Sequence, residues 1–163
     1  MACKDSIMTA VGKGDSLTPE QRHYNMSRIR SKNTKPEELV RKYLFSQGFR
    51  YRKNDKRYPG KPDIVLPKYH TVVFVHGCFW HQHPGCMKAR IPKSNLDYWG
   101  PKLQRNSERD EAERQQLEDM GWRVIVVWEC EILNKKKREE RLGSLAEEIK
   151  TISGKDLRKF VSF

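Results

Sequence analysis

The sequence lacks long apolar runs and has few cysteines. No hydrophobic stretch approaches the roughly 20 residues that a membrane-spanning helix needs, and residues 1–17 lack the apolar core of a signal peptide. We therefore expect a cytoplasmic protein that makes no membrane contact and begins with a flexible tail at residues 1–17. Thiols stay reduced in that compartment. The four cysteines, Cys3, Cys78, Cys86 and Cys130, then need an explanation other than disulfides.

Acidic residues are also scarce. Against 33 Lys and Arg the chain of 163 residues has 21 Asp and Glu, and its net charge is +12. The stretch from Glu20 to Lys61 holds 13 basic and 4 acidic residues, which is +9 of that total. A concentrated positive field attracts a polyanion such as DNA, because neutralised phosphates release their counterions. Charge alone would also fit a ribosomal or membrane-surface protein.

The length fits one compact domain, which we place at residues 18–163. Thr18, Pro19 and Gln21 are typical of a helix start, and Gly48 ends a second helix. Apolar periodicity predicts further elements in the order strand, strand, strand, helix, strand, helix. The expected ranges are helices 18–31 and 34–47, strands 49–52, 62–66 and 71–75, helix 101–120, strand 122–128 and a last helix through Leu142 and Ile149. This order predicts an α/β domain with a mixed central sheet flanked by helices.

The loop after the third strand is dense in metal-binding residue types. It reads HGCFWHQHPGC from His76 to Cys86, and Cys130 follows the strand WRVIVVW. Clustered cysteines in a reducing compartment favour a structural zinc site of the Cys3His type. Cys78, His83, Cys86 and Cys130 would complete such a set, although spacing alone does not decide which histidine is the ligand. The alternative is that the cysteines are small buried apolar residues.

A second candidate site surrounds Asp63, which stands where the PGKPD turn enters a strand. Metal-dependent nucleases need a hard oxygen ligand there to hold Mg²⁺ against the scissile phosphate, and a group that activates water. The alternative is that Pro62-Asp63 is only a turn signal.

Four motifs together resemble the very-short-patch repair (Vsr-type) endonucleases. They are PGKPDI, FVHGCFWHQHPGC, NSERD and GWRVIVVWEC, and the resemblance runs from about Asn25 to Cys130. It implies a restriction-endonuclease-like fold with a structural Zn²⁺, in a bacterial protein that acts as a monomer on the nucleoid. It also implies Mg²⁺-dependent nicking of double-stranded DNA 5′ to the T of a T:G mismatch that arises from deaminated 5-methylcytosine. Coupling to a MutL-type mismatch-repair protein is a further implication.

The same resemblance assigns site residues by their motif positions. Asp63 and the backbone carbonyl of Val75 would hold Mg²⁺. His76 and His81 would be the catalytic histidines, with His81 the better candidate for activating water. Asp110 would orient a catalytic histidine, and Glu37 would hold a metal-bound water. The implied zinc ligands are Cys78, His83, Cys86 and Cys130.

Aromatic and apolar side chains would distort the DNA. The resemblance implies that Phe79 and Trp80 insert beside the mismatch, while the helix at 18–31 enters the opposite groove with Met26 and Ile29. That helix also carries Arg22, Arg28 and Arg30. Wedges between base steps cost least where pairing is already defective. The alternative for these four apolar residues is ordinary core packing.

The chain departs from the family pattern at Gln82 and at one additional residue before Cys86, which puts its sequence context in doubt. Two other functions compete with mismatch nicking. One is a restriction-type nuclease that cuts both strands, and the other is a zinc-stabilised DNA-binding module without catalysis. Asp63 with two nearby histidines argues against the second, because binding alone needs no acid.

Overall fold

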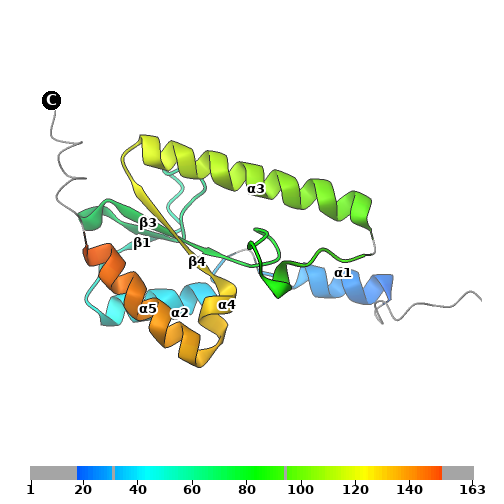
Figure 1. The fold of residues 1–163 in the computed structure, drawn as a ribbon, viewed down its shortest axis with the longest axis horizontal. Coiled ribbons are helices and arrows are strands. Elements are labelled where there is room, and N and C mark those ends of the chain that lie inside the picture. Colours follow the sequence, from blue (N-terminus) through cyan, green and yellow to red (C-terminus); the bar gives the residue numbers. More distant parts are fainter. Residues whose placement is uncertain (1–17, 31, 94, 152–163) are drawn as a thin grey trace, which may run out of the picture. The chain divides into compact units, whose positions relative to one another are not determined.

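The computed structural model describes residues 18–30, 32–93 and 95–151 (Figure 1). The chain divides into two units, Met1–Lys32 and Asn33–Phe163, and each is described by itself. The expected flexible tail at residues 1–17 lies outside the described residues, and so does Cys3. In the described part of the chain, every helix is too short or too polar to cross a membrane.

The first unit contains helix α1 (Pro19–Ser27). As the sequence predicts, it starts with a capping box, in which the Thr18 hydroxyl accepts from the Gln21 N–H at 3.2 Å and the Gln21 side chain accepts from the Thr18 N–H at 2.9 Å. The helix ends before residue 31, so Ile29 follows it in a turn. Met26 and Ile29 are 38% and 49% exposed. Core packing therefore does not account for these two side chains.

The second unit is built on a four-stranded mixed sheet in the order β1-β2-β3-β4. The strands are β1 (Arg52–Lys53), β2 (Ile64–Leu66), β3 (Thr71–His76) and β4 (Arg123–Trp128). β1, β2 and β3 pair antiparallel, whereas β3 and β4 pair parallel with Thr71 opposite Arg123 and His76 opposite Trp128. The predicted α/β class and mixed sheet are confirmed.

Helices cover both faces of this sheet (Figure 1). α2 (Lys35–Ser46), α4 (Glu129–Leu133) and α5 (Lys135–Lys150) lie on one face, and α3 (Leu96–Asp119) lies on the other. Alternate strand residues divide between two cores. Ile64, Val73 and Ile125 pack under α2 and α5, whereas Val65 and Val72 pack against α3.

Several boundaries differ from the sequence-based expectation. The strand expected at 49–52 starts later and is shorter, at Arg52–Lys53. Phe49 instead packs in the core directly after the end of α2. α3 begins at Leu96 and contains Pro101, which the sequence placed at the helix start because proline favours the first turn. The short helix α4 was not predicted, since five residues are too few to show helical periodicity.

Candidate functional site: a cysteine cluster beside a histidine–carboxylate cluster

The parallel pairing of β3 and β4 brings the two ends of the predicted zinc site together. Cys78, His83 and Cys86 lie in the loop after β3, and Cys130 lies in α4 directly after β4. His83 Nδ1 is 3.7 Å from Cys78 Sγ and 3.4 Å from Cys130 Sγ. The ligand atoms of all four residues lie within 4.8 Å of one another.

This geometry fits a tetrahedral metal site. Zinc bonds of about 2.3 Å to sulfur and 2.0–2.1 Å to nitrogen give a sulfur–nitrogen edge of about 3.6 Å in a tetrahedron. The Trp128 ring stacks on His83 with 4.1 Å between centroids and 8° between planes, which holds the imidazole in place. Burial raises the pKa of the Cys78 thiol to about 12. A metal ion would therefore displace a tightly held proton from this ligand. The cluster could hold a metal ion.

A second cluster joins His76 at the end of β3, His81 in the loop and Asp110 on α3. His81 Nδ1 lies 2.5 Å from Asp110 Oδ2, so that His81 donates its Nδ1 proton and keeps Nε2 as the basic nitrogen. The His76 ring stacks on His81 with 3.9 Å between centroids and 10° between planes. Burial, with the nearby His81 as a second cause, lowers the pKa of His76 to about 4. The neutral form of His76 is therefore favoured at physiological pH, and the His81 ring is oriented by Asp110.

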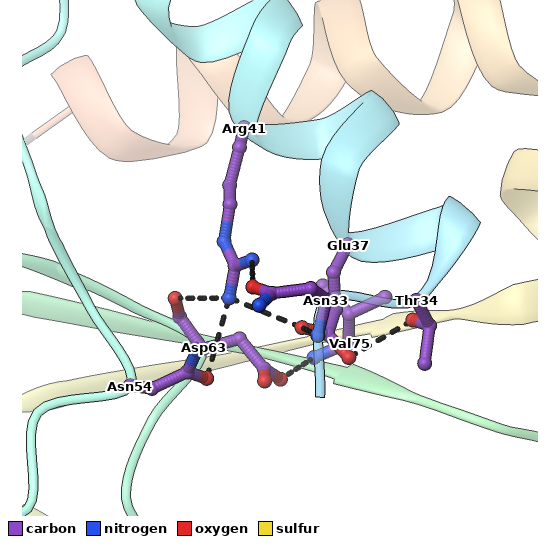
Figure 2. A network of polar contacts seen from close by, with 7 residues as sticks. All are labelled: Asn33, Thr34, Glu37, Arg41, Asn54, Asp63 and Val75. Atoms are coloured by element: carbon purple, nitrogen blue, oxygen red, sulfur yellow. Dashed lines mark hydrogen bonds and ion pairs between the residues drawn. The ribbon is translucent and has the colours of Figure 1, made fainter. Parts of the chain in front are cut away.

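Asp63 lies at the start of β2 and faces β3. Its Oδ2 accepts from the Val75 N–H at 2.7 Å (Figure 2). The pKa of Asp63 is raised to about 6. Burial is the main cause and the Glu37 carboxylate adds to it, whereas the Val75 N–H, Arg41 and His81 act in the opposite direction. The Val75 N–H binds Asp63, and the next residue, His76, stacks on His81, so Asp63 lies beside the histidine cluster.

Glu37 is 4% exposed and both its carboxylate oxygens have partners. Oε2 accepts from the Asn33 N–H at 3.0 Å and pairs with Arg41 at 3.1 Å, and Oε1 accepts from the Thr34 hydroxyl at 2.9 Å (Figure 2). Glu37 thus also closes the first turn of α2, a local role that the sequence signal for a helix start had suggested.

Two charged residues near Asp63 and the histidine cluster were not predicted from the sequence. Arg41 is buried beside Glu37, and the only sequence signal was an acid and a base four residues apart. Glu113 follows Asp110 on α3 and packs over Gly60, where φ is +69° and an added Cβ would meet Glu113 Oε2 at 2.7 Å. The glycine of the PGKPD turn is therefore favoured by the backbone conformation, whereas the contact is with the end of the flexible Glu113 side chain.

Phe79 and Trp80 form an aromatic cluster with Trp99 of α3. The ring centroids are 5.1 Å apart for Phe79–Trp80, 5.3 Å for Phe79–Trp99 and 5.9 Å for Trp80–Trp99. The Lys102 ammonium lies 5.6 Å from the Trp80 ring. All three aromatic side chains are partly exposed and stand outside the two cores. Trp99 was not predicted, because it approaches the loop only through the path of α3.

Comparisons with known proteins decide the family. A family model described as DNA mismatch endonuclease Vsr matches residues 14–88. The Type II nicking enzyme V.NmeAIP of Neisseria meningitidis is 60% identical over 136 residues, which cover 83% of this chain and 96% of that protein. The chain belongs to the Vsr family. The resemblance found in the motifs is thereby confirmed, and with it the assignment to the DNA endonucleases.

Other Vsr relatives match over similar lengths. The Type II nicking enzyme V.XorIIP of Xanthomonas oryzae pv. oryzae is 50% identical over 131 residues, covering 80% of this chain and 96% of that protein. The DNA mismatch endonuclease Vsr of Escherichia coli is 38% identical over 128 residues, covering 78% of this chain and 81% of that protein. Since the aligned lengths exceed residues 14–88, the Vsr likeness extends beyond the part that the family model matches.

Proposed function

We propose that this Vsr-family protein nicks DNA 5′ to the T of a T:G mismatch by Mg²⁺-dependent phosphodiester hydrolysis. The observation that carries the proposal is the pair formed by His81 and Asp110 in the neighbourhood of the Asp63 carboxylate. An oriented base and a hard oxygen ligand in one place are the two groups that metal-assisted hydrolysis needs. The names of the relatives, which include nicking and mismatch endonucleases, favour the same reaction.

Each residue would act through its position. Asp63 would hold Mg²⁺ together with the Val75 carbonyl, and since Oδ2 is bonded to the Val75 N–H, Oδ1 is the oxygen left for the ion. Bound there, Mg²⁺ would neutralise charge on the scissile phosphate. His81 Nε2 would accept a proton from the attacking water, and Asp110 would stabilise the resulting imidazolium. Neutral His76 would keep the His81 ring in place by stacking.

Glu37 would place a second carboxylate beside Asp63 and orient water there. Its buried ion pair with Arg41 holds the carboxylate in place. The hard oxygens of Asp63 and Glu37 suit Mg²⁺ better than softer metals.

The cysteine cluster would hold a structural Zn²⁺ through Cys78, His83, Cys86 and Cys130. Three thiolates and one imidazole leave no open coordination position, which is the mark of a structural site. This zinc would fix the loop that carries His81 and the aromatic cluster. The mixed sheet with helices on both faces is compatible with a restriction-endonuclease-like domain at residues 18–163.

Phe79 and Trp80, joined by Trp99, would insert beside the mismatch, and α1 would bring Met26 and Ile29 to the opposite groove. The partial exposure of all five side chains supports this role. Action as a monomer in the cytoplasm and coupling to a MutL-type protein stay predictions of the family resemblance.

One assay tests the proposed function. The purified protein is incubated with Mg²⁺ and a duplex that carries either one T:G mismatch or a matched T:A pair, with each strand labelled separately. We expect a single nick 5′ to the mismatched T and no cut in the T:A duplex. Cleavage of both strands of the matched duplex would instead identify a restriction-type nuclease. Binding without cleavage would identify a zinc-stabilised DNA-binding module.

A further inference from the structure

The buried Arg41 connects the Glu37 carboxylate to the main chain of Asp63. Arg41 is 5% exposed and lies one turn after Glu37 on α2. Its Nη2 pairs with Glu37 Oε2 at 3.1 Å and donates to the Asp63 main-chain carbonyl at 3.1 Å and to Asn54 Oδ1 at 3.3 Å. Its Nη1 donates to Asn33 Oδ1 at 2.8 Å (Figure 2). One guanidinium thus holds α2 and the β1–β2 connection against the start of β2.

These contacts fix Asp63 from two sides. Arg41 binds its main-chain carbonyl, and the Val75 N–H binds Oδ2 of its side chain. Asp63 therefore has little freedom to turn its remaining oxygen away from a metal ion. Groups that hydrogen-bond a metal ligand fix its orientation and change the affinity of the site for the metal ion.

The charges are also matched to a divalent cation. Glu37 and Asp63 supply two carboxylates and Arg41 supplies one guanidinium, so the group carries a net charge of −1 when both acids are ionised. Without Arg41, the buried Glu37 would lose its ion-pair partner and would repel Asp63, which is costly in a protein interior. A lysine would keep the charge but could not reach all four acceptors, because its ammonium is a single point and the guanidinium is a planar fork.

We propose that Arg41 is a positioning residue that aligns Asp63 and Glu37 for binding of the catalytic divalent ion. This inference rests on the proposed function, since it assigns Arg41 a part in the same metal site. A purely structural Arg41 would stabilise the fold and leave metal affinity unchanged in the folded protein. The two roles are therefore separable by measuring metal binding and stability on the same variants.

The chain offers a matched control in Arg123. Its guanidinium donates to the main-chain carbonyls of Thr151 and Ile149 at 3.1 Å each, and its Nε is buried without a partner, as is that of Arg41. Arg123 begins β4 opposite Thr71, whereas His76 lies at the other end of the same strand pair. Arg123→Lys thus removes a partly buried guanidinium fork at the end of the strand pair opposite His76.

The experiment compares wild type, Arg41→Lys and Arg123→Lys as full-length zinc-loaded proteins in complex with a T:G duplex. Electron paramagnetic resonance of free Mn²⁺ gives the Kd of the metal, and thermal melting gives the fraction folded. Loss of such a partner typically weakens metal binding about 10- to 100-fold. We expect a rise of this size in the Mn²⁺ Kd of Arg41→Lys, and a parallel rise in the Mg²⁺ concentration for half-maximal single-turnover nicking. Arg123→Lys should bind Mn²⁺ as wild type does.

An unchanged Mn²⁺ Kd in folded Arg41→Lys overturns the proposal, and so does an equal loss in Arg123→Lys. If Arg41→Lys does not fold, Asn54→Gly decides, because it removes one acceptor of the fork and suits the positive φ of +45° at Asn54. A weaker Mn²⁺ affinity in Asn54→Gly supports the role of Arg41, and a wild-type affinity contradicts it. A further outcome separates this inference from the proposed function. If the wild-type protein nicks no duplex, and Arg41→Lys still binds Mn²⁺ more weakly than wild type does, the proposed function is wrong and the role of Arg41 stands.

Discussion

Cys130 Sγ lies 3.4 Å from His83 Nδ1, although 47 residues separate the two in the sequence. The contact exists because β3 and β4 pair in parallel and end side by side. The loop after β3 carries His81 and the aromatic cluster, so the anchor at Cys130 also determines where these groups lie. Metal content, folding and catalysis should therefore depend on one another in this protein.

The first prediction concerns metal content. Wild-type protein should hold one zinc per chain, and Cys130→Ser should be poorly folded, because structural zinc contributes directly to the free energy of folding. Elemental analysis with circular dichroism tests both statements. Active protein that contains no zinc would rule out the structural zinc site.

The second prediction concerns Asp63 and catalysis. Asp63→Asn should keep its affinity for a T:G duplex and lose nicking in Mg²⁺, because an amide is a poor substitute for a charged oxygen ligand. Gel-shift titration and a nicking assay on the same preparation measure the two properties. Cleavage near the wild-type rate would move the metal-ligand role to another acid, with Glu37 next in line.

The third prediction concerns Asp63 and pH. Its pKa is about 6 in the folded protein against 3.8 for the ordinary group, so protonated Asp63 is favoured by folding. The stabilisation is fully present below pH 3.8 and is lost as the pH rises through 6. In magnesium-free buffer that contains zinc, Asp63→Asn should thus melt higher than wild type at pH 7.5. That advantage should shrink as the pH falls toward 4.

The control for this pH effect is Asp119→Asn, which replaces an exposed carboxylate at the end of α3. Differential scanning calorimetry at several pH values compares the variants. A melting temperature of Asp63→Asn that parallels wild type at every pH would contradict the raised pKa of Asp63.

The fourth prediction treats His81 and Asp110 as one unit. His81→Ala should slow single-turnover nicking by about 10²- to 10⁴-fold, the usual contribution of a general base. Asp110→Asn should have a comparable effect, since an amide can donate to Nδ1 and would leave the proton on Nε2. The double variant should be little slower than either single variant. A double variant whose loss is the product of the two single losses would show that the residues act independently.

The fifth prediction concerns Trp80. Base–aromatic stacking is worth about 1–3 kcal/mol per base, so Trp80→Ala should weaken mismatch binding by about 5- to 150-fold with little change in melting temperature. Trp122 is the matched control, because it is partly buried and packs against the core cluster under α3, with 4.8 Å between its ring centroid and that of Tyr58. Trp122→Ala should lower the melting temperature and keep the preference for T:G over T:A. The reverse pattern in the two variants would make Trp80 the core residue.

Local signals in the sequence predicted the elements that depend on near neighbours. Thr18 and Gln21 predicted a helix start, and the apolar residues from Thr71 to Val75 predicted a strand. The three cysteines of the cluster were predicted from residue type, because few other roles suit thiols in a reducing compartment, whereas the choice of His83 came from the family resemblance. Arg41 was not predicted, because its acceptors at Asn33, Asn54 and Asp63 come together only in the folded chain. A buried arginine carries no local signal that separates it from an exposed one.

The parallel partnership of β3 and β4 has a consequence for biosynthesis. A ribosome adds about 5–20 residues per second, so the 47 residues from His83 to Cys130 take about 2–9 s to appear. During that interval the loop with His81 exists without its last thiol and without the strand that supports it. The nascent polypeptide thus lacks a complete cysteine cluster until Cys130 has been synthesised.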